Sequence, residues 1–333
     1  MISKLSAAFK ALASDAKMDN RLRMDEPLSR HTSLRIGGPA AIWAEVDSIG
    51  ELEAILSLAR GEGLAIHLVG LGSNVLFGDD GVMGVVLRLG GELAGWERVA
   101  ASGDKASFWV GGGAINAHLV KGLLKQGFVG AEFLSLIPGT LGGAIALNAG
   151  TKEHEIESIL QSVDLMVFNT ETGRWQRQTV ERSGLSMSYR HAELPEDAIV
   201  VAGCIEVVRG DVDAARKNIR FDKDRRNETQ PYRLASVGST FANPTGDFAG
   251  RLIEAVGLKG VSIGGARISP LHANFFINEA EASAKDFLSL MALARVRVRR
   301  SFGVELRPEV RFVGFDGWSQ MLEIERDLER HGC

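Results

Sequence analysis

The segment that best predicts a chemical role is residues 137–150, which read IPGTLGGAIALNAG. Glycines leave backbone N–H groups uncovered, so a run of them can approach a bulky anion closely. A purely structural turn needs one or two glycines, whereas this segment has four. We therefore predict a ligand-binding segment, whose contacting residues are Pro138, Gly139, Thr140, Gly142, Gly143 and Asn148.

A second glycine-rich turn, GLGSN, follows an apolar stretch that ends at Val69. It lacks the third glycine of a doubly wound dinucleotide fingerprint, because Val75 stands in that place. A tight turn without a ligand explains this pentapeptide equally well. Two such turns in one half of the chain still indicate a cofactor with a pyrophosphate, in contact with Gly70, Gly72, Ser73 and Asn74.

Three further polar positions could take part in catalysis, although the residues alone favour an ordinary role for each. Arg190 could hold a carboxylate or phosphate, but such an arginine more often packs its stem on the surface. Ser239 could deliver a proton, yet a serine in a turn such as GSTFANP is usually a turn residue. Glu309 alternates with Val310 in a strand-like stretch over residues 307–314, which is typical of an ion pair at a strand edge.

Other chemistries find little support in the sequence. The turn around Ser239 lacks the Gly-x-Ser-x-Gly elbow of hydrolases. The seven histidines show no metal-ligand spacing with cysteine or acidic residues, so no metal is predicted. Only Cys204 and Cys333 are present, which argues against a disulfide framework.

Helices and strands alternate around these positions. Helices are predicted at residues 3–17, 48–62, 115–126, 211–227, 249–255 and 284–302, and strands at 41–46, 66–70, 82–89, 108–111, 162–169, 173–178 and 199–208. Ser48 is the candidate N-cap of the second helix, whose apolar face carries Leu52, Ile55, Leu56 and Ala59. The helix dipole explains the basic run over residues 295–300.

Composition indicates an ordinary globular protein. The chain has 333 residues, of which 45% are hydrophobic, so two or three domains are expected. A formal net charge of −4 gives no electrostatic reason to expect binding to nucleic acid or to an anionic membrane. No apolar run approaches the roughly 20 residues of a membrane span, and no signal pattern opens the chain. We therefore expect a cytoplasmic protein.

Taken together, the motifs resemble those of the UDP-N-acetylenolpyruvoylglucosamine reductases, from about Leu28 to Gly314. The resemblance depends on the order and spacing of several segments, which are TSLRIGGP, GLGSN, EFLSLIPGTLGGAIALNAG, SYR, GSTFANP, GGARISPLHANFFIN and residues 302–314. It implies an α+β chain with a two-subdomain FAD-binding fold of the vanillyl-alcohol oxidase type and a C-terminal α+β substrate domain. The corresponding boundaries are 1–25 for an N-terminal extension, 26–95 and 96–209 for the FAD-binding subdomains, 210–316 for the substrate domain and 317–333 for a tail.

The resemblance also implies a reaction of peptidoglycan synthesis. NADPH reduces non-covalently bound FAD, which then reduces the enolpyruvyl group of the UDP-sugar to give UDP-N-acetylmuramate. By resemblance Ser239 is the proton donor, and Arg190 and Glu309 stabilise the charge that develops on the substrate. Candidate substrate contacts are Tyr189, Arg225 and Asn243. The single charged helix before Gly238 is similar to the shorter subtype of the family, which lacks an inserted tyrosine loop.

Some residues depart from the family pattern. Residues 151–154 read TKEH where an aromatic residue and glycine are usual, and Ala242 stands where a basic residue is usual. The tail, with a helical pattern from Leu322 to Leu328, lies outside the resemblance. Two alternatives stay open, a flavin oxidase of the same fold and a non-catalytic UDP-sugar-binding homologue. The oligomeric state is also open, with a monomer as the working expectation.

Overall fold

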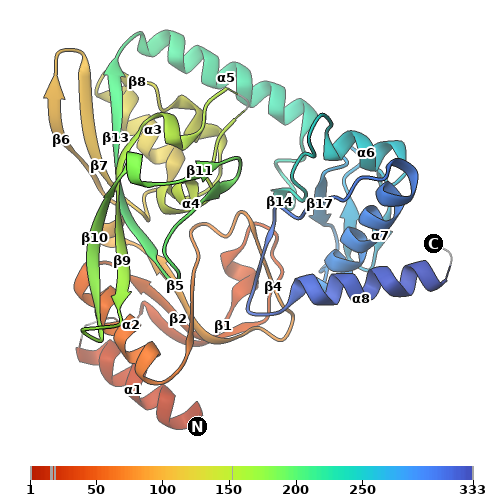
Figure 1. Ribbon diagram of the computed structural model, residues 1–333, viewed down its shortest axis with the longest axis horizontal. Coiled ribbons are helices and arrows are strands. Elements are labelled where there is room, and N and C mark those ends of the chain that lie inside the picture. Colours follow the sequence, from red (N-terminus) through yellow and green to blue (C-terminus); the bar gives the residue numbers. More distant parts are fainter. Residues whose placement is uncertain (1, 16–17, 19, 152, 332–333) are drawn as a thin grey trace. The chain divides into compact units, whose positions relative to one another are not determined.

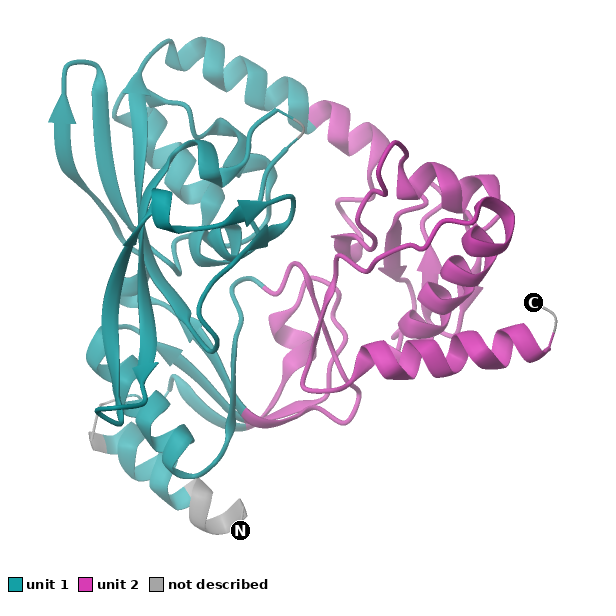
Figure 2. Cartoon of the chain, viewed as in Figure 1, with its two compact units in different colours: residues 1–24, 42–71, 85–223 teal, residues 25–41, 72–84, 224–333 magenta. Residues whose placement is uncertain are grey.

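The computed structural model describes the whole chain except residues 1, 16, 17, 19, 152, 332 and 333. Lys152 and Cys333 therefore lie outside the described residues. The chain divides into two compact units, coloured separately in Figure 2. Unit 1 contains residues 1–24, 42–71 and 85–223, and unit 2 contains residues 25–41, 72–84 and 224–333.

Unit 1 carries more strands than unit 2 (Figure 1). Its elements are α1 (Ile2–Asp15), α2 (Ile49–Gly61), β3 (Ala65–Leu68), β6 (Trp96–Ser102), β7 (Lys105–Gly111), α3 (Asn116–Lys125), β8 (Phe128–Val129), α4 (Leu141–Ala146), β9 (Leu160–Asn169), β10 (Arg174–Glu181), β11 (Met187–Ser188), β12 (His191–Ala192) and β13 (Ile199–Arg209). Four elements contain residues of both units, namely β1 (Leu22–Pro27), β2 (Pro39–Val46), β5 (Val82–Leu89) and α5 (Val212–Thr229).

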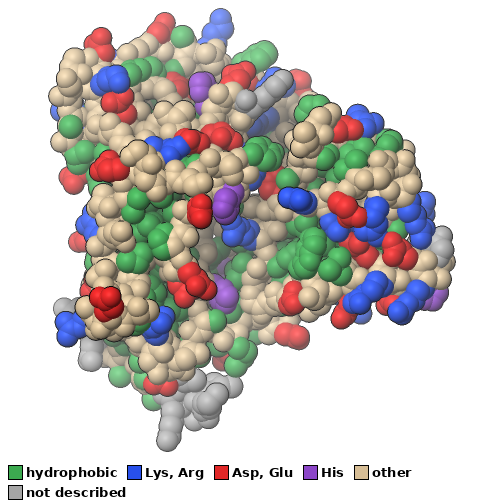
Figure 3. Space-filling model, in the orientation of Figure 1, with side chains coloured by type: hydrophobic (Ala, Val, Ile, Leu, Met, Phe, Trp, Pro, Cys, Tyr) green, Lys and Arg blue, Asp and Glu red, His purple; other side chains and the backbone are tan. Residues whose placement is uncertain are grey.

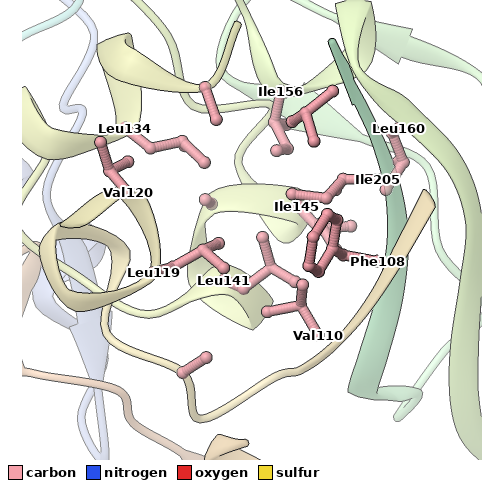
Figure 4. Close-up of a cluster of buried hydrophobic side chains, with 14 of the residues drawn as sticks. Phe108, Val110, Leu119, Val120, Leu134, Leu141, Ile145, Ile156, Leu160 and Ile205 are labelled. Atoms are coloured by element: carbon pink, nitrogen blue, oxygen red, sulfur yellow. The ribbon is translucent and has the colours of Figure 1, made fainter. Parts of the chain in front are cut away.

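The larger sheet of unit 1 is antiparallel and has the order β10-β9-β13-β7-β6, with β8 paired to β13. This confirms the strands predicted at residues 162–169, 173–178 and 199–208. Alternate residues of β7 are buried because successive side chains of a strand point to opposite faces. On the covered face, α3 and α4 bury a cluster that includes Phe108, Leu141 and Ile145 (Figure 4).

The second sheet has the strand order β1-β2-β5-β3. A separate apolar cluster, built by α1, α2 and strands of this sheet, lies within unit 1. The Ser48 hydroxyl accepts a hydrogen bond from the Glu51 amide at 3.3 Å, which confirms it as the N-cap of α2. The predicted apolar face is also confirmed, since its buried residues are Leu52, Ile55, Leu56 and Ala59.

Unit 2 contains a small antiparallel sheet, in the order β14-β17-β16-β15, and a separate parallel pair of β18 with β4. Its elements are β4 (Val75–Phe77), β14 (Ala235–Ser239), α6 (Ala249–Ala255), β15 (Ser262–Ile263), β16 (Ala266–Ile268), β17 (Phe275–Asn278), α7 (Ala284–Phe302), β18 (Arg311–Val313) and α8 (Gly317–Arg330). Ser283 begins α7 with a reciprocal capping box to Asp286, and Gly303, at φ 67°, ends it. The predicted bounds of this helix are confirmed.

The tail forms a helix, α8, and changes the interpretation of the basic run on α7. Arg295 is not a solvent-exposed cation near the helix end; it is 4% exposed and bonds Glu325 of α8. Burial by itself would lower the pKa of Arg299. Its guanidinium donates to the other oxygen of Glu325 at 3.0 Å and also to Glu329 and Glu305, and these bonds raise that pKa above its usual value. The dipole argument missed Arg295 because its partner lies 30 residues further along the chain.

No helix in the described part of the chain combines the length and apolar character needed to cross a bilayer. Among the same residues, no three His, Cys, Asp or Glu side chains gather as ligands for a metal ion.

Candidate functional site

Gly70, at the start of the first glycine-rich turn, meets the second glycine-rich turn within unit 1. A methyl group added to Gly70 would lie 2.7 Å from the Thr140 hydroxyl oxygen, so the backbone of the first turn touches a side chain of the second. Thr140 itself is buried and forms an isolated bridge with Ile115. The structure therefore brings together at one place two segments that are about 70 residues apart in sequence.

The second turn contains a short helix, α4, that the sequence analysis did not predict. Its Leu141 and Ile145 side chains pack toward Phe108 in the apolar cluster, which fixes the helix against the sheet (Figure 4). Gly142 lies on this packed side, where an added methyl would come within 3.0 Å of the Gly112 carbonyl oxygen. Gly143 is exposed, and its added methyl would meet only the Thr140 hydroxyl, at 3.8 Å. Packing therefore explains Gly142 but leaves Gly143 with an open backbone.

Sequence reasoning missed a third glycine run, residues 111–113, and the residue behind it, Asn116. Asn116 is buried; its side-chain amide donates to the Ile137 carbonyl at 3.2 Å, and its backbone amide donates to the Gly139 carbonyl. These bonds hold the entry to the second turn. The side-chain oxygens of Asn116 and Ser135 are buried without a hydrogen-bond partner among the described residues. Such polar atoms beside bare glycine backbone fit a bound polar ligand.

Arg190 lies in the tight hairpin between β11 and β12, also in unit 1. Its backbone has φ 57°, a left-handed conformation that is costly for arginine and persists only where the surroundings impose it. The guanidinium donates to the Gly150 carbonyl at 3.2 Å and lies 4.8 Å from the Tyr189 ring. A strained, half-buried arginine of this kind is typical of a functional site rather than of a free surface position.

Asn148 connects the glycine-rich segment to this hairpin. It is fully buried, and its amide donates to the Ser188 carbonyl at 3.1 Å and to Glu155 at 3.0 Å. Its side-chain oxygen accepts from the Glu157 amide at 3.3 Å. The side chain that we predicted as a cofactor contact therefore also positions the loop that carries Arg190.

Ser239 and Glu309 both belong to unit 2, where one backbone segment connects them. Ser239 ends β14, opposite Phe275 of β17, after a register shift that follows Ser236. Gly238 precedes it with φ 76°, a conformation open to glycine. The carbonyl of the next residue, Thr240, accepts a hydrogen bond from the Glu309 backbone amide at 2.9 Å. The serine and the glutamate thus lie on neighbouring stretches of backbone.

The stretch over residues 307–314 differs from the predicted strand. Only Arg311–Val313 forms a strand, β18, and before it an isolated bridge joins Pro308 to Phe241. Glu309 is half-buried, whereas Arg307 and Arg311 are exposed. Asn74 holds this stretch, since its side-chain amide donates to the Glu309 carbonyl at 3.1 Å and its own carbonyl accepts the Arg311 amide at 3.0 Å. An asparagine predicted to contact the cofactor thus also fixes the backbone of Glu309.

The remaining predicted positions have mixed surroundings. Gly72 has φ 63°, and an added methyl would clash with the His31 carbonyl at 2.1 Å, so packing alone requires glycine there. The exposed Asn243 accepts the Ala249 amide at 3.1 Å and so supports the start of α6. Tyr189 and Arg225 are exposed, whereas Ser73 is half-buried. A cavity of about 540 Å³ in unit 2, whose lining includes Arg35, Asp79 and Glu281, contains none of the predicted site residues.

Charge on the surface is mixed. On the face drawn in Figure 3, Lys and Arg side chains are interspersed with Asp and Glu side chains. This agrees with the small formal net charge of −4.

Comparison with known proteins identifies the family. Residues 40–177 match the FAD binding domain, and residues 230–313 match the C-terminal domain of UDP-N-acetylenolpyruvoylglucosamine reductase. Reductases of that name from Anaeromyxobacter sp. and Moorella thermoacetica are 41% and 38% identical, over 90% and 91% of this chain and 92% and 98% of theirs.

A crystal structure of the reductase from Thermus caldophilus superposes with a TM-score of 0.72 and 32% identity, over 87% of this chain and 97% of that one. The predicted arrangement of an FAD-binding domain followed by a C-terminal domain of the reductase family is confirmed. With this extent of identity and coverage, the chain belongs to the UDP-N-acetylenolpyruvoylglucosamine reductase family.

Proposed function

We propose that this FAD-dependent reductase uses NADPH as hydride donor and that Ser239, Arg190 and Glu309 carry the chemistry on the sugar nucleotide. The family reaction is the reduction of the enolpyruvyl group of a UDP-sugar in peptidoglycan precursor synthesis. The observation that carries the residue assignment is the backbone bond from Glu309 to Thr240, which keeps Glu309 beside the turn of Ser239.

The residues of unit 1 fit a bound dinucleotide. A methyl group added to Gly143 would meet only the Thr140 hydroxyl, at 3.8 Å, and unpartnered polar atoms lie beside the segment that precedes α4. We propose that the FAD pyrophosphate lies against this backbone and against the turn at Gly70, with non-covalent contacts from the predicted residues of both segments. When bound, FAD would supply the redox chemistry, by which a hydride from NADPH would reach the enolpyruvyl double bond.

Ser239 then delivers the proton to the carbon next to the one that receives hydride. A positioned general acid contributes roughly 10²–10⁴-fold to such a step. Addition of hydride to the vinyl group pushes negative charge toward the substrate carboxylate, so that carboxylate gains basicity before the proton arrives. Arg190 stabilises this charge as a fixed cation, and Glu309 stabilises it as a hydrogen-bond donor when protonated. The left-handed backbone conformation of Arg190, at φ 57°, costs free energy and persists only because the surrounding structure imposes it, so the hairpin presents the arginine in one fixed backbone conformation.

We place the sugar-nucleotide contacts at Tyr189, Arg225 and Asn243, and we assign the chain to the subtype without the inserted tyrosine loop. The support for the subtype is the short connection between β13 and β14, which consists of residues 210–211, α5 and residues 230–234. We also propose the three-domain division drawn from the sequence, with boundaries near residues 95 and 209, and a monomeric enzyme.

The test separates the two half-reactions by stopped-flow absorbance without oxygen. Ser239→Ala is expected to leave flavin reduction by NADPH within about threefold of wild type and to slow flavin reoxidation by the enolpyruvyl substrate by about 10²–10⁴-fold. Glu309→Gln should impair the same half-reaction alone. Normal reoxidation in the serine variant would refute the proton-donor role. Rapid reoxidation by oxygen, with no response to the sugar nucleotide, would indicate an oxidase instead.

A further inference from the structure

The turn that follows Ser239 is held by one buried side chain, that of Asn274. Asn274 is 3% exposed and lies just before β17. Its side-chain oxygen accepts the Phe241 amide at 3.0 Å, and its side-chain nitrogen donates to the Phe241 carbonyl at 2.8 Å. The side-chain amide of Asn274 thus bonds both the N–H and the C=O of Phe241, as the backbone of a neighbouring strand would.

The backbone of Asn274 adds a third bond to the same turn, because its carbonyl accepts the Thr240 amide at 2.8 Å. Thr240 and Phe241 are both fully buried, so no water replaces these partners. On its other side, the same stretch of backbone bonds the segment that carries Glu309. The Thr240 carbonyl accepts a hydrogen bond from the Glu309 amide, and the Ala242 amide donates to the Arg307 carbonyl at 2.9 Å. The turn is therefore fixed between Asn274 and the stretch that carries Glu309.

His272 fixes Asn274 in turn. The Nδ1 atom of His272 accepts a hydrogen bond from the backbone amide of Asn274 at 3.2 Å, which assigns the ring proton to Nε2. Burial lowers the pKa of His272, and the charge of Lys259 lowers it further, so the ring stays neutral and keeps this acceptor near neutral pH.

We propose that Asn274 is a positioning residue for the proton donor Ser239 and for Glu309, an inference that rests on the function proposed above. In this role Asn274 acts through the backbone of the turn: it holds in place Ser239, which delivers the proton, and Glu309, which stabilises the charge on the substrate carboxylate. Loss of its side chain leaves two buried backbone groups of Phe241 without partners, so the turn moves to satisfy them. A displacement of about 1 Å at reacting groups lowers a rate by about 10²-fold.

Two variants and one matched control test the proposal. Asn274→Ala removes both side-chain bonds. Asn274→Asp keeps the size of the side chain and the bond to the Phe241 amide but places an oxygen against the Phe241 carbonyl, so it remains informative if the alanine variant does not fold. The control is Ser269→Ala. Ser269 is fully buried and accepts hydrogen bonds from the backbone amides of Leu271 and His272 at 3.1 and 3.4 Å. It belongs to the turn between β16 and β17, and neither bond involves Thr240 or Phe241.

The measurement is the reoxidation rate per bound flavin, with flavin reduced by NADPH and, in parallel, by dithionite. Asn274→Ala is expected to slow reoxidation by the enolpyruvyl substrate about 10²-fold and Asn274→Asp at least about tenfold, with a larger solvent isotope effect because proton delivery becomes limiting. Flavin reduction should stay within about threefold of wild type. Amide exchange over residues 239–242, followed without substrate, should become faster in both variants and stay unchanged in Ser269→Ala.

Each outcome has a separate meaning because Ser239→Ala is measured alongside. If the serine variant is slow but both Asn274 variants reoxidise normally, the positioning role is wrong while the proposed function stands. If the Asn274 variants lose both half-reactions equally, or if Ser269→Ala shows the same selective defect, the side chain only supports folding and the proposal is overturned. If Ser239→Ala itself is normal, the proposed function fails first.

Discussion

The buried ion pair between α7 and α8 makes the most direct prediction about stability. Arg295 and Glu325 are 4% and 3% exposed and bond one another, and Arg295 also donates to the carbonyl of the fully buried Leu306. The helix that supplies Glu325 lies beyond the region matched to the family domain, which ends at residue 313. Removal of either partner leaves a charge without its main counter-charge in a region closed to water.

The expected cost follows from what each partner retains. Breaking a buried pair costs about 3–5 kcal/mol. After Glu325→Met, Arg295 still faces Glu305 at 3.1 Å, and after Arg295→Met, Glu325 still faces Arg299 at 3.0 Å. We therefore expect each single variant to lose about 3 kcal/mol of unfolding free energy, at the lower end of that range. The double variant should lose less than the sum, by about 1–3 kcal/mol, because neither charge is then left buried.

The assay is equilibrium unfolding in urea, which is uncharged and leaves ion pairs unscreened. The control is Glu329→Gln, which removes an exposed partner of Arg299 at 2.5 Å and should cost less than about 1 kcal/mol. Additive effects of the two single substitutions within about 0.5 kcal/mol would refute the reasoning, as would single effects no larger than that of the control.

Three further predictions concern individual positions. Gly143→Ala replaces an exposed helix glycine, so it should stabilise the apoprotein by up to about 1 kcal/mol, yet it should weaken FAD binding in a fluorescence titration. The control Gly50→Ala, in α2, should leave FAD affinity unchanged. Equal FAD affinity in both variants would contradict the proposed contact between FAD and the Gly143 backbone. Ser283→Ala removes the α7 cap and should lower the unfolding free energy by about 1 kcal/mol, seen as a lower urea midpoint; an unchanged midpoint argues against the cap. Burial by itself would raise the pKa of Asp164, but hydrogen bonds from Thr179 and Arg177 hold that pKa below its usual value. The stability that Asp164 contributes is therefore present above the unfolded pKa of about 3.9 and is lost as pH falls through the lower folded pKa. Asp164→Asn should flatten the decline of unfolding free energy in acid, and an unchanged acid profile would contradict this role of the carboxylate.

The sequence by itself determined the features that depend on near neighbours along the chain. The cap at Ser48, the apolar face of α2, the bounds of α7 and the alternating strands of the larger sheet were all predicted, because each follows from residue type and periodicity within about a dozen positions. The two glycine-rich turns were also visible for this reason. The order of the motifs was enough to give the family and fold class.

Only the tertiary structure decided which distant residues support the site. Asn274 bonds Phe241 across 33 positions, Asn74 bonds the Glu309 carbonyl across 235, and Arg295 finds Glu325 across 30. Each of these bonds depends on strand order and on the packing of helices that no local pattern specifies. A buried backbone or charged group needs a partner, and its identity is set by whichever segment the fold brings within about 3 Å.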